Sequence, residues 1–185
     1  MVRVATPVTD TVQGGGLYTP EQKARRDTTR WTLVQGVLAP LQFLVFLVSL
    51  ALVIRFLVNG VGYEAATLSV VVKTLVLYLI MVTGAIWEKV VFGQYLFAPA
   101  FFWEDVFSML VLALHTAYLV AVFTGALGAG GQMWLALAAY AAYVINAGQF
   151  VWKLRLARLQ AANSQRTDGH YGPLPGAALS QEGAV

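Results

Sequence analysis

Four apolar stretches, each longer than twenty residues, constrain the fold of this 185-residue chain more than any other feature. A helix needs roughly 20 mainly apolar residues to cross a hydrocarbon core about 30 Å thick. Hydrophobic residues make up 58% of the chain and charged residues 11%, whereas a soluble domain usually carries about 25% charged residues. The sequence therefore predicts an all-α integral membrane protein whose four transmembrane helices form an antiparallel bundle, at about residues 33–57, 66–88, 101–124 and 132–153.

The segments around these spans indicate one domain with two tails. Short connections at residues 59–62, 92–99 and 125–131 contain glycine, asparagine or proline, which end helices, so consecutive spans should be antiparallel neighbours. Residues 18–160 are predicted to form the membrane domain. The polar residues 1–17 and 161–185 are predicted to be a disordered leader and a disordered tail.

A short charged helix is expected just before the first span. Thr19 fits an N-cap, Pro20 fits the first helical position, and Gln22 completes a capping box. The helix should run through Arg30 and lie on the membrane surface.

Lysine and arginine indicate the orientation of the protein. They are concentrated before the first span and after the fourth, whereas the first connection has only Arg55 beside it and the third has none. Because such residues favour the cytoplasmic side, both termini and the connection near Lys89 are expected there. The net charge of +3 therefore reflects membrane orientation, and nucleic acid is not an expected partner.

Several kinds of chemistry lack their usual residues. The chain has no cysteine, which excludes disulfides, thiolate metal sites, iron–sulfur clusters and a cysteine nucleophile. It also has no phosphate-binding loop, no dinucleotide fingerprint and no pair of histidines at metal-ligand spacing. Redox work or ATP-driven work by this chain alone is not expected.

Polar residues within the spans are costly and are therefore candidates for function. Most fall in the predicted cytoplasmic leaflet. Three carboxylic acids should lie there at similar heights, and like charges held close together cannot all be ionised cheaply, so one could keep a proton for general acid catalysis. Alternatively, the acids only mark helix ends or stabilise a helix N-terminus. The polar candidates are Gln35, Gln42, Glu88, Glu104, Asp105, Asn146 and Gln149.

His115 is the only histidine in a span. It shares one helix face with Glu104, Ser108 and Val111, a stripe about 16 Å long at 1.5 Å per residue. It could ligate a metal, such as the magnesium of a chlorophyll-type ring or a haem iron, or it could hydrogen-bond a neighbouring helix. Lys73 is expected to be structural, either extending outward or pairing with Glu64.

Aromatic residues cluster at the predicted cytoplasmic end. An interfacial belt explains many of them. The stretch 95–103 is unusually rich in rings and could instead form one wall of a site for a flat apolar ring system. Tyr118 adds a hydroxyl in the third span, and the ring-binding candidates at the end of the bundle are Trp87, Phe102 and Trp103.

Two groups of motifs lie in the predicted domain, one at its start and a second, stronger one at its centre. The motifs are YTPEQ at 18–22, RRD at 25–27, WTLVQG at 31–36, APLQF at 39–43, GAIWEK at 84–89, FAPAFFWED at 97–105 and HTAY at 115–118. These motifs resemble the 3-vinyl bacteriochlorophyllide hydratase family, also called 2-vinyl bacteriochlorophyllide hydratase. The likeness covers roughly residues 17–160.

The resemblance implies an enzyme in the inner membrane of a photosynthetic bacterium. It would add water to the C3-vinyl group of a chlorophyllide or bacteriochlorophyllide during bacteriochlorophyll synthesis, giving a 1-hydroxyethyl group. Substrate, membrane lipid and other pigment-synthesis enzymes are the implied partners. No cofactor is expected, since hydration needs neither electrons nor a nucleotide, and the magnesium belongs to the substrate.

The residue roles follow from chemistry and depth and not from the family. Glu104 or Glu88 is the expected acid, and Asp105 is the expected ionised partner that stabilises positive charge. Gln35, Gln42, Asn146 and Gln149 could hold the water or a ring carbonyl, and His115 could ligate the ring magnesium.

Two rival functions differ in what they require. A non-catalytic pigment-binding or assembly protein would depend on His115 alone as its anchor, with Glu104 replaceable. A small transporter or channel would need polar residues through the whole depth of the bilayer, whereas here they are concentrated in one leaflet.

Overall fold

The computed structural model describes residues 17–170, and over that range the chain is entirely helical, as predicted. Residues 1–16 of the expected leader and residues 171–185 of the expected tail lie outside the described residues. Four of the five helices are long and apolar enough to cross a membrane. The helices are α1 (Pro20–Thr28), α2 (Arg30–Asn59), α3 (Tyr63–Phe92), α4 (Phe102–Thr124) and α5 (Ala129–His170).

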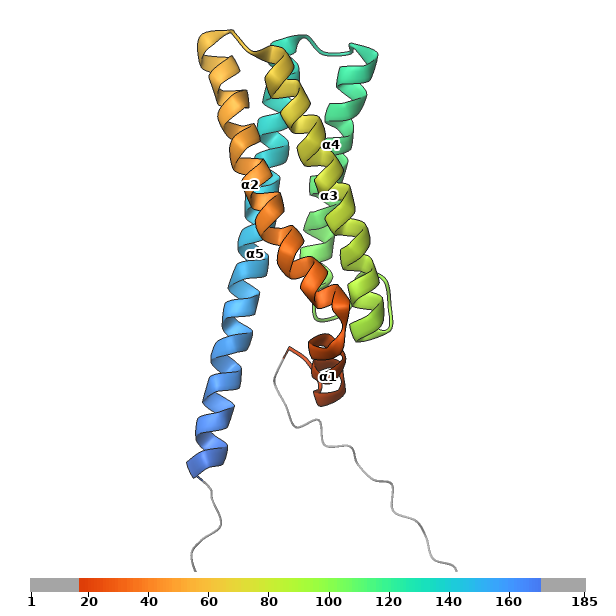
Figure 1. Cartoon of the computed structure of the whole chain (residues 1–185), viewed down its shortest axis with the longest axis vertical. Helices are drawn as coiled ribbons and strands as arrows, with labels where there is room; N and C mark the ends of the chain where they lie inside the picture. The colour runs from red at the N-terminus through yellow and green to blue at the C-terminus, as the bar shows by residue number, and fades with distance from the viewer. Residues whose placement is uncertain (1–16, 171–185) are drawn as a thin grey trace, which may run out of the picture.

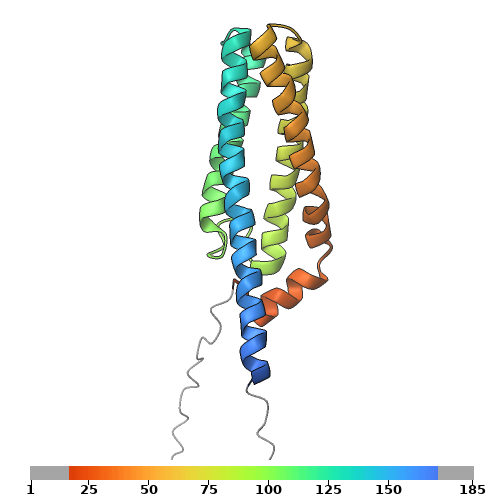
Figure 2. The same ribbon diagram turned by 90° about the vertical axis from the view of Figure 1, so that its left-hand side faces the viewer.

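The four long helices pack as two antiparallel hairpins. The helices α2 and α3 form one hairpin and α4 and α5 the other, and contacts of α2 with α5 and of α3 with α4 join them into a bundle (Figure 1). The short helix α1 lies across the end of the bundle at which α3 ends and α4 begins (Figures 1 and 2). The antiparallel four-helix bundle predicted from the short connections is therefore confirmed.

Left-handed glycines end α2 and α3. Gly60 has φ 68° and its N–H donates to the carbonyl of Phe56, while Gly93 has φ 88° and its N–H donates to the carbonyl of Lys89. A residue with a side chain is strained in this conformation, so glycine is the residue that most readily reverses the chain here. The α3–α4 connection that follows Gly93 carries the candidate site.

The bundle has an apolar exterior and buries polar as well as apolar side chains. Large hydrophobic side chains face outward, with Phe123 79%, Val58 75% and Leu33 71% exposed. Such a surface suits lipid, in which polar groups must be satisfied inside the protein. The buried polar or charged side chains are Gln42, Ser49, Lys73, Thr74, Thr83, Glu88, Glu104, Asp105, Ser108, His115, Gln132 and Asn146.

The prediction that Lys73 extends outward or pairs with Glu64 is wrong. Lys73 is fully buried, and its Nζ lies 4.0 Å from the ring centroid of Tyr143 and 5.6 Å from that of Tyr140. Lys73 lies on the face of α3 that carries Val70, which is directed into the bundle. The cation therefore rests on aromatic faces of α5, where the ring quadrupoles attract it.

The capping box predicted at the start of the domain is confirmed. The Thr19 Oγ1 accepts from the N–H of Gln22, and the Gln22 side chain accepts from the N–H of Thr19. The helix α1 ends at Thr28, two residues earlier than expected, because Thr29 is extended and caps α2.

The helix α5 is longer than the predicted fourth span. It continues to His170, so residues 161–170, assigned to the tail by sequence, are helical. Residues 154–168 contain neither glycine nor proline and are rich in strong helix formers. At 1.5 Å per residue, α5 is about 63 Å long and extends beyond the bundle (Figure 2).

Candidate active site

Two adjacent backbone N–H groups in the α3–α4 connection each donate a hydrogen bond to a carboxyl group. The Asp105 Oδ2 accepts from the N–H of Phe97 at 2.7 Å, and the Glu88 Oε2 accepts from the N–H of Ala98 at 3.4 Å. Glu88 comes from the last turns of α3 and Asp105 from the first turn of α4. Phe97 has φ 59°, an uncommon conformation for a residue other than glycine. This local turn therefore directs two neighbouring N–H groups at side chains from two helices.

The two carboxyl groups are neighbours, because they accept from the N–H groups of consecutive residues. Both side chains are buried, with Glu88 6% and Asp105 4% exposed. An ionised carboxylate only accepts hydrogen bonds, so a hydrogen bond between two carboxyl groups requires a proton on one of them. The geometry therefore suits a pair that holds one proton.

A third acid beside this pair has a different partner. Glu104 accepts a hydrogen bond from Lys153 of α5, with 2.7 Å between Oε2 and Nζ. The Lys153 Nζ also lies 5.1 Å from the ring centroid of Phe101. The site therefore combines a carboxyl pair with an adjacent ion pair, and it joins α3, α4 and α5.

Phe101 is the centre of an aromatic cluster at this end of the bundle. Its ring centroid lies 5.8 Å from those of Trp87, Phe92 and Phe150, and 6.4 Å from that of Tyr18. Phe101 itself is only 3% exposed. The cluster is linked to the acids through Lys153, whose Nζ lies over the Phe101 ring and donates to Glu104.

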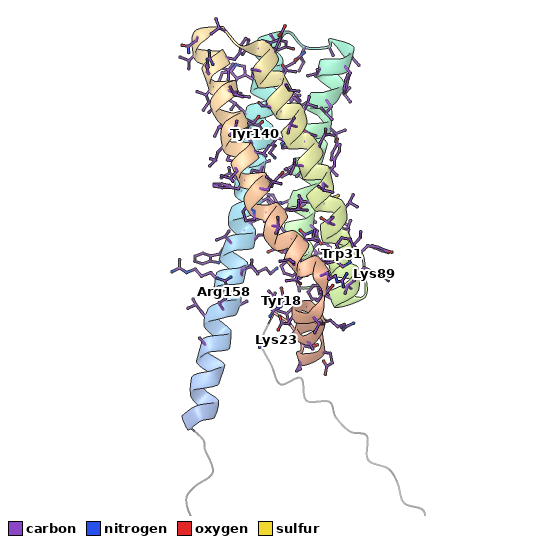
Figure 3. The ribbon with its side chains drawn as sticks, viewed as in Figure 1. Tyr18, Lys23, Trp31, Lys89, Tyr140 and Arg158 are labelled. Atoms are coloured by element: carbon purple, nitrogen blue, oxygen red, sulfur yellow. The ribbon has the colours of Figure 1, made fainter. Side chains whose placement is uncertain are left out.

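Tyr18 attaches the start of the chain to this cluster. Its ring stacks on Phe92 at 5.8 Å, and the Arg26 guanidinium lies 4.7 Å from the Tyr18 ring centroid. Burial raises the pKa of the Tyr18 phenol, so the hydroxyl stays protonated well above neutral pH. Figure 3 shows Tyr18 between α1 and the end of the bundle, near Trp31 and Lys89.

Of the aromatic residues predicted for the site, the structure brings in Trp87 but not the other two. The Trp87 Nε1–H donates to the Thr32 Oγ1 at 2.9 Å, which holds the indole between α2 and α3. Phe102 is 43% exposed and Trp103 is 68% exposed, so both lie on the outer surface of the bundle. Their position fits a lipid-facing belt.

The predicted amides lie at two depths. The Gln35 Nε2 donates to the Thr83 Oγ1 at 2.8 Å, and the Asn146 Nδ2 donates to the Ser108 Oγ at 2.8 Å. Gln42 is 2% exposed, and neither of its amide atoms has a hydrogen-bond partner among the described residues. The Gln149 Oε1 likewise has none within residues 17–170. Asn146 and Ser108 lie deeper than the carboxyl groups, since Ser108 is one turn beyond Glu104 on α4.

His115 and Tyr118 lie far from the carboxyl groups. Both are fully buried, but His115 follows Glu104 by about 16 Å along α4. The His115 Nδ1 lies 2.8 Å from the carbonyl of Val111. The buried stripe predicted on α4 is therefore present, whereas the structure does not bring His115 or Tyr118 to the carboxyl pair.

Two parts of the site were missed by the sequence reasoning. One is the pairing of Lys153 with Glu104, for which the signal was a basic residue at the predicted height of the acids. The other is Phe150, one turn before the basic end of α5. No group of three or more histidine, aspartate or glutamate side chains able to hold a metal ion occurs in the described part of the chain.

Comparisons with known proteins give a consistent result. The family model described as 2-vinyl bacteriochlorophyllide hydratase matches residues 18–156. A 2-vinyl bacteriochlorophyllide hydratase of Rhodobacter capsulatus is 75% identical over 147 residues, covering 80% of this chain and 85% of the relative. One of Cereibacter sphaeroides is 72% identical over 149 residues, covering 80% and 92%. No solved structure matches the chain.

Proposed function

Because the chain belongs to the 2-vinyl bacteriochlorophyllide hydratase family, we propose that it adds water to the vinyl group of a bacteriochlorophyllide or chlorophyllide. The group called 2-vinyl in this family name is the C3-vinyl group of the family's other name. The product carries a 1-hydroxyethyl group. The carboxyl pair of Glu88 and Asp105 is the observation that supports this function, because it offers a proton donor and a proton acceptor at one place.

The reaction begins with proton transfer from this pair to the terminal vinyl carbon. The π electrons form the new C–H bond, and positive charge develops on the carbon next to the ring and spreads into the macrocycle. Water then attacks that carbon and gives a proton back to the pair, so the enzyme is regenerated and the net change is addition of one water. The chemistry moves no electrons to or from an outside acceptor, and we propose no cofactor.

The residues around the pair have supporting roles. Between Glu88 and Glu104, the ion pair with Lys153 favours Glu88 as the proton donor, since Glu104 already holds a cation. The Asp105 carboxylate, together with that of Glu88 once it has donated its proton, stabilises the developing positive charge. The aromatic cluster around Phe101 provides a surface for the macrocycle.

Substrate is proposed to enter from the membrane surface. The ring is apolar and the propionate of an unesterified chlorophyllide is charged, so the propionate stays at the headgroups near Arg30 and Lys89. This end of the bundle is proposed to face the cytoplasm in the inner membrane of a photosynthetic bacterium. Membrane lipid and other pigment-synthesis enzymes are the proposed neighbours.

Oxygen-18 incorporation tests the function. Membranes that contain the protein are incubated with a 3-vinyl chlorophyllide or bacteriochlorophyllide in oxygen-18 water, and the pigment is analysed by mass. The proposal predicts gain of one labelled water, absent in control membranes. Pigment that co-purifies stoichiometrically with the protein but never gains water, with both ring types tried, would instead support a pigment-binding protein.

A further inference from the structure

Among residues 17–170, buried polar atoms without hydrogen-bond partners occur at several depths inside the bundle. The Gln149 Oε1 lies near the carboxyl groups, and Gln42 and the Asn146 Oδ1 lie deeper. The His115 Nε2 and the Lys73 Nζ lie deeper still, and the hydroxyl groups of Tyr118 and Thr67 follow beyond them. On α4, the hydroxyl of Ser108 that bonds Asn146 is one turn from Glu104, and His115 is three turns from it. These atoms therefore follow one another from the carboxyl groups into the bundle.

The side chains of His115 and Lys73 lie beside the same aromatic ring. The His115 ring centroid lies 5.8 Å from that of Tyr140, and the Lys73 Nζ lies 5.6 Å from the same ring. The three residues come from α4, α3 and α5, so they surround a position in the middle of the bundle. Tyr140 is buried, and Figure 3 shows it far from Tyr18 along the long axis of the bundle.

The chemistry of these atoms calls for a ligand that both donates and accepts hydrogen bonds. A carbonyl can only accept, so the His115 Nδ1 carries the hydrogen that bonds Val111, and the neutral ring then presents Nε2 as an acceptor. Lys73 presents donors, Asn146 presents an acceptor, and the Gln42 amide presents both. Burying such groups without partners is costly, because each loses its hydrogen bonds to water. Water, which is small and has both functions, satisfies all of them.

We propose that water molecules fill a polar column through the bundle, from the carboxyl groups of Glu88 and Asp105 to Lys73 and His115. Beyond this level the interior is mostly apolar, with Val53, Ala66 and Met133, and among the described residues the hydroxyl groups of Tyr118 and Thr67 are the unpartnered buried polar groups there. The role of the column rests on the proposed function. Water is a substrate of hydration, the outside of the bundle is apolar, and the column keeps water next to the reacting carbon.

The absence of cysteine from all 185 residues makes the column testable by single cysteine substitutions. Only a thiolate reacts, and a cysteine in an apolar environment stays protonated, so reaction with Ag⁺ reports local water. Ser108→Cys and Ser49→Cys place a thiol at the middle and deep levels, since the Ser49 hydroxyl bonds the Tyr140 hydroxyl. Val53→Cys and Ala66→Cys are the controls, because both positions are 0% exposed and lie in the apolar layer beyond.

The proposal predicts that Ag⁺ blocks both serine-derived thiols at least tenfold faster than the two control thiols, in intact membranes. Adding Gln42→Leu should slow the reaction at Ser49→Cys. Two results would overturn the proposal. If none of the four thiols reacts, no water reaches the serine positions. If all four react equally fast, the bundle is loosely packed and has no distinct water column.

A measurement on the unmodified chain covers the case in which a variant does not fold. Hydroxyl radicals generated by X-rays form from local water, so Tyr140 should be hydroxylated although it is 2% exposed. An unmodified Tyr140 would contradict the column. Neither readout depends on catalysis, so the two proposals can fail separately. Positive labelling without hydration would contradict the proposed function and leave the column standing. Hydration without labelling would contradict the column and leave the proposed function standing.

Discussion

At the scale of single residues, the backbone of Phe97 holds the carboxyl pair in place. Its φ of 59° turns the chain so that its own N–H meets Asp105 and the next N–H meets Glu88. A residue with a Cβ is strained there by about 1–2 kcal/mol. Strain of this kind is usually kept where function requires the geometry.

Two substitutions of Phe97 distinguish the effect of its backbone conformation from the effect of its side chain. Phe97→Gly and Phe97→Val both lose the aromatic contact with Phe102. Glycine adopts positive φ freely, whereas the β-branched valine resists it. The hydration rate of Phe97→Val is therefore expected to be about tenfold lower than that of Phe97→Gly, by the strain estimate above. Equal rates in the two variants would show that the conformation at Phe97 does not matter for catalysis.

The ion pair between Glu104 and Lys153 is expected to contribute to stability. The Glu104 side chain is 9% exposed and that of Lys153 is 26% exposed, so loss of one partner leaves a largely buried charge. Glu104→Gln and Lys153→Met should each destabilise the protein by about 1–3 kcal/mol. The double variant should lose less than the sum of the two, because the partners interact. Thermal unfolding in detergent measures this, and strictly additive losses would argue against the pair.

The sequence predicted some of these residues well and others not at all. Glu88, Glu104 and Asp105 could be placed together because each lies within a few residues of a readable helix end. The pairing of Glu104 with Lys153 joins residues 49 positions apart, so it depends on how α4 and α5 pack. The prediction for Lys73 is wrong for the same reason. The sequence indicates how deep Lys73 lies in the membrane, but not which face of α3 packs against the bundle.

At the scale of elements, α1 and α5 differ in how far their local sequence determines them. The capping box of α1 is a local signal, and its residues were read directly. In the last part of α5, two sequence signals disagree. The helix propensity of the residues favours a helix, whereas the polar composition of residues 161–170 favours a disordered tail, and the structure shows the helix. The loop that carries Phe97 has no sequence signature, because its residue in the left-handed region is not glycine.

The capping box gives a prediction about α1. Thr19→Ala removes the acceptor for the Gln22 N–H and should destabilise α1 by about 1 kcal/mol. Amide hydrogen exchange in residues 20–28 should then become faster, while exchange in α3 stays unchanged. Unchanged exchange in α1 would mean that the contacts of Tyr18 with Phe92 and Phe101 hold the helix without its cap.

At the scale of the whole molecule, two antiparallel hairpins place all the candidate catalytic groups at one end. An even number of spans puts the ends of the membrane domain on the same side. The helix α1 lies at that end, and α5 extends beyond the bundle on the same side (Figure 1). The bundle therefore concentrates charge and catalytic groups together and leaves the opposite end as two short turns.

This topology predicts the result of reporter fusions. Reporters active only in the cytoplasm should work when fused after Val185 or inserted at Gln94, and should fail when inserted at Gly60 or Gly128. The reverse pattern would invert the orientation inferred from lysine and arginine. Activity at both Gly60 and Gln94 would contradict the four spans themselves.

The most direct test of the account compares the hydration rates of Glu88→Gln and Glu64→Gln. The glutamine at 88 keeps an oxygen for the N–H of Ala98 but cannot donate the carboxyl proton, whereas Glu64 is exposed at the other end of the bundle. The account predicts that Glu88→Gln hydrates the vinyl group at least about 100-fold more slowly while still binding pigment, and that Glu64→Gln retains the full rate. A Glu88→Gln protein with the full rate would contradict it.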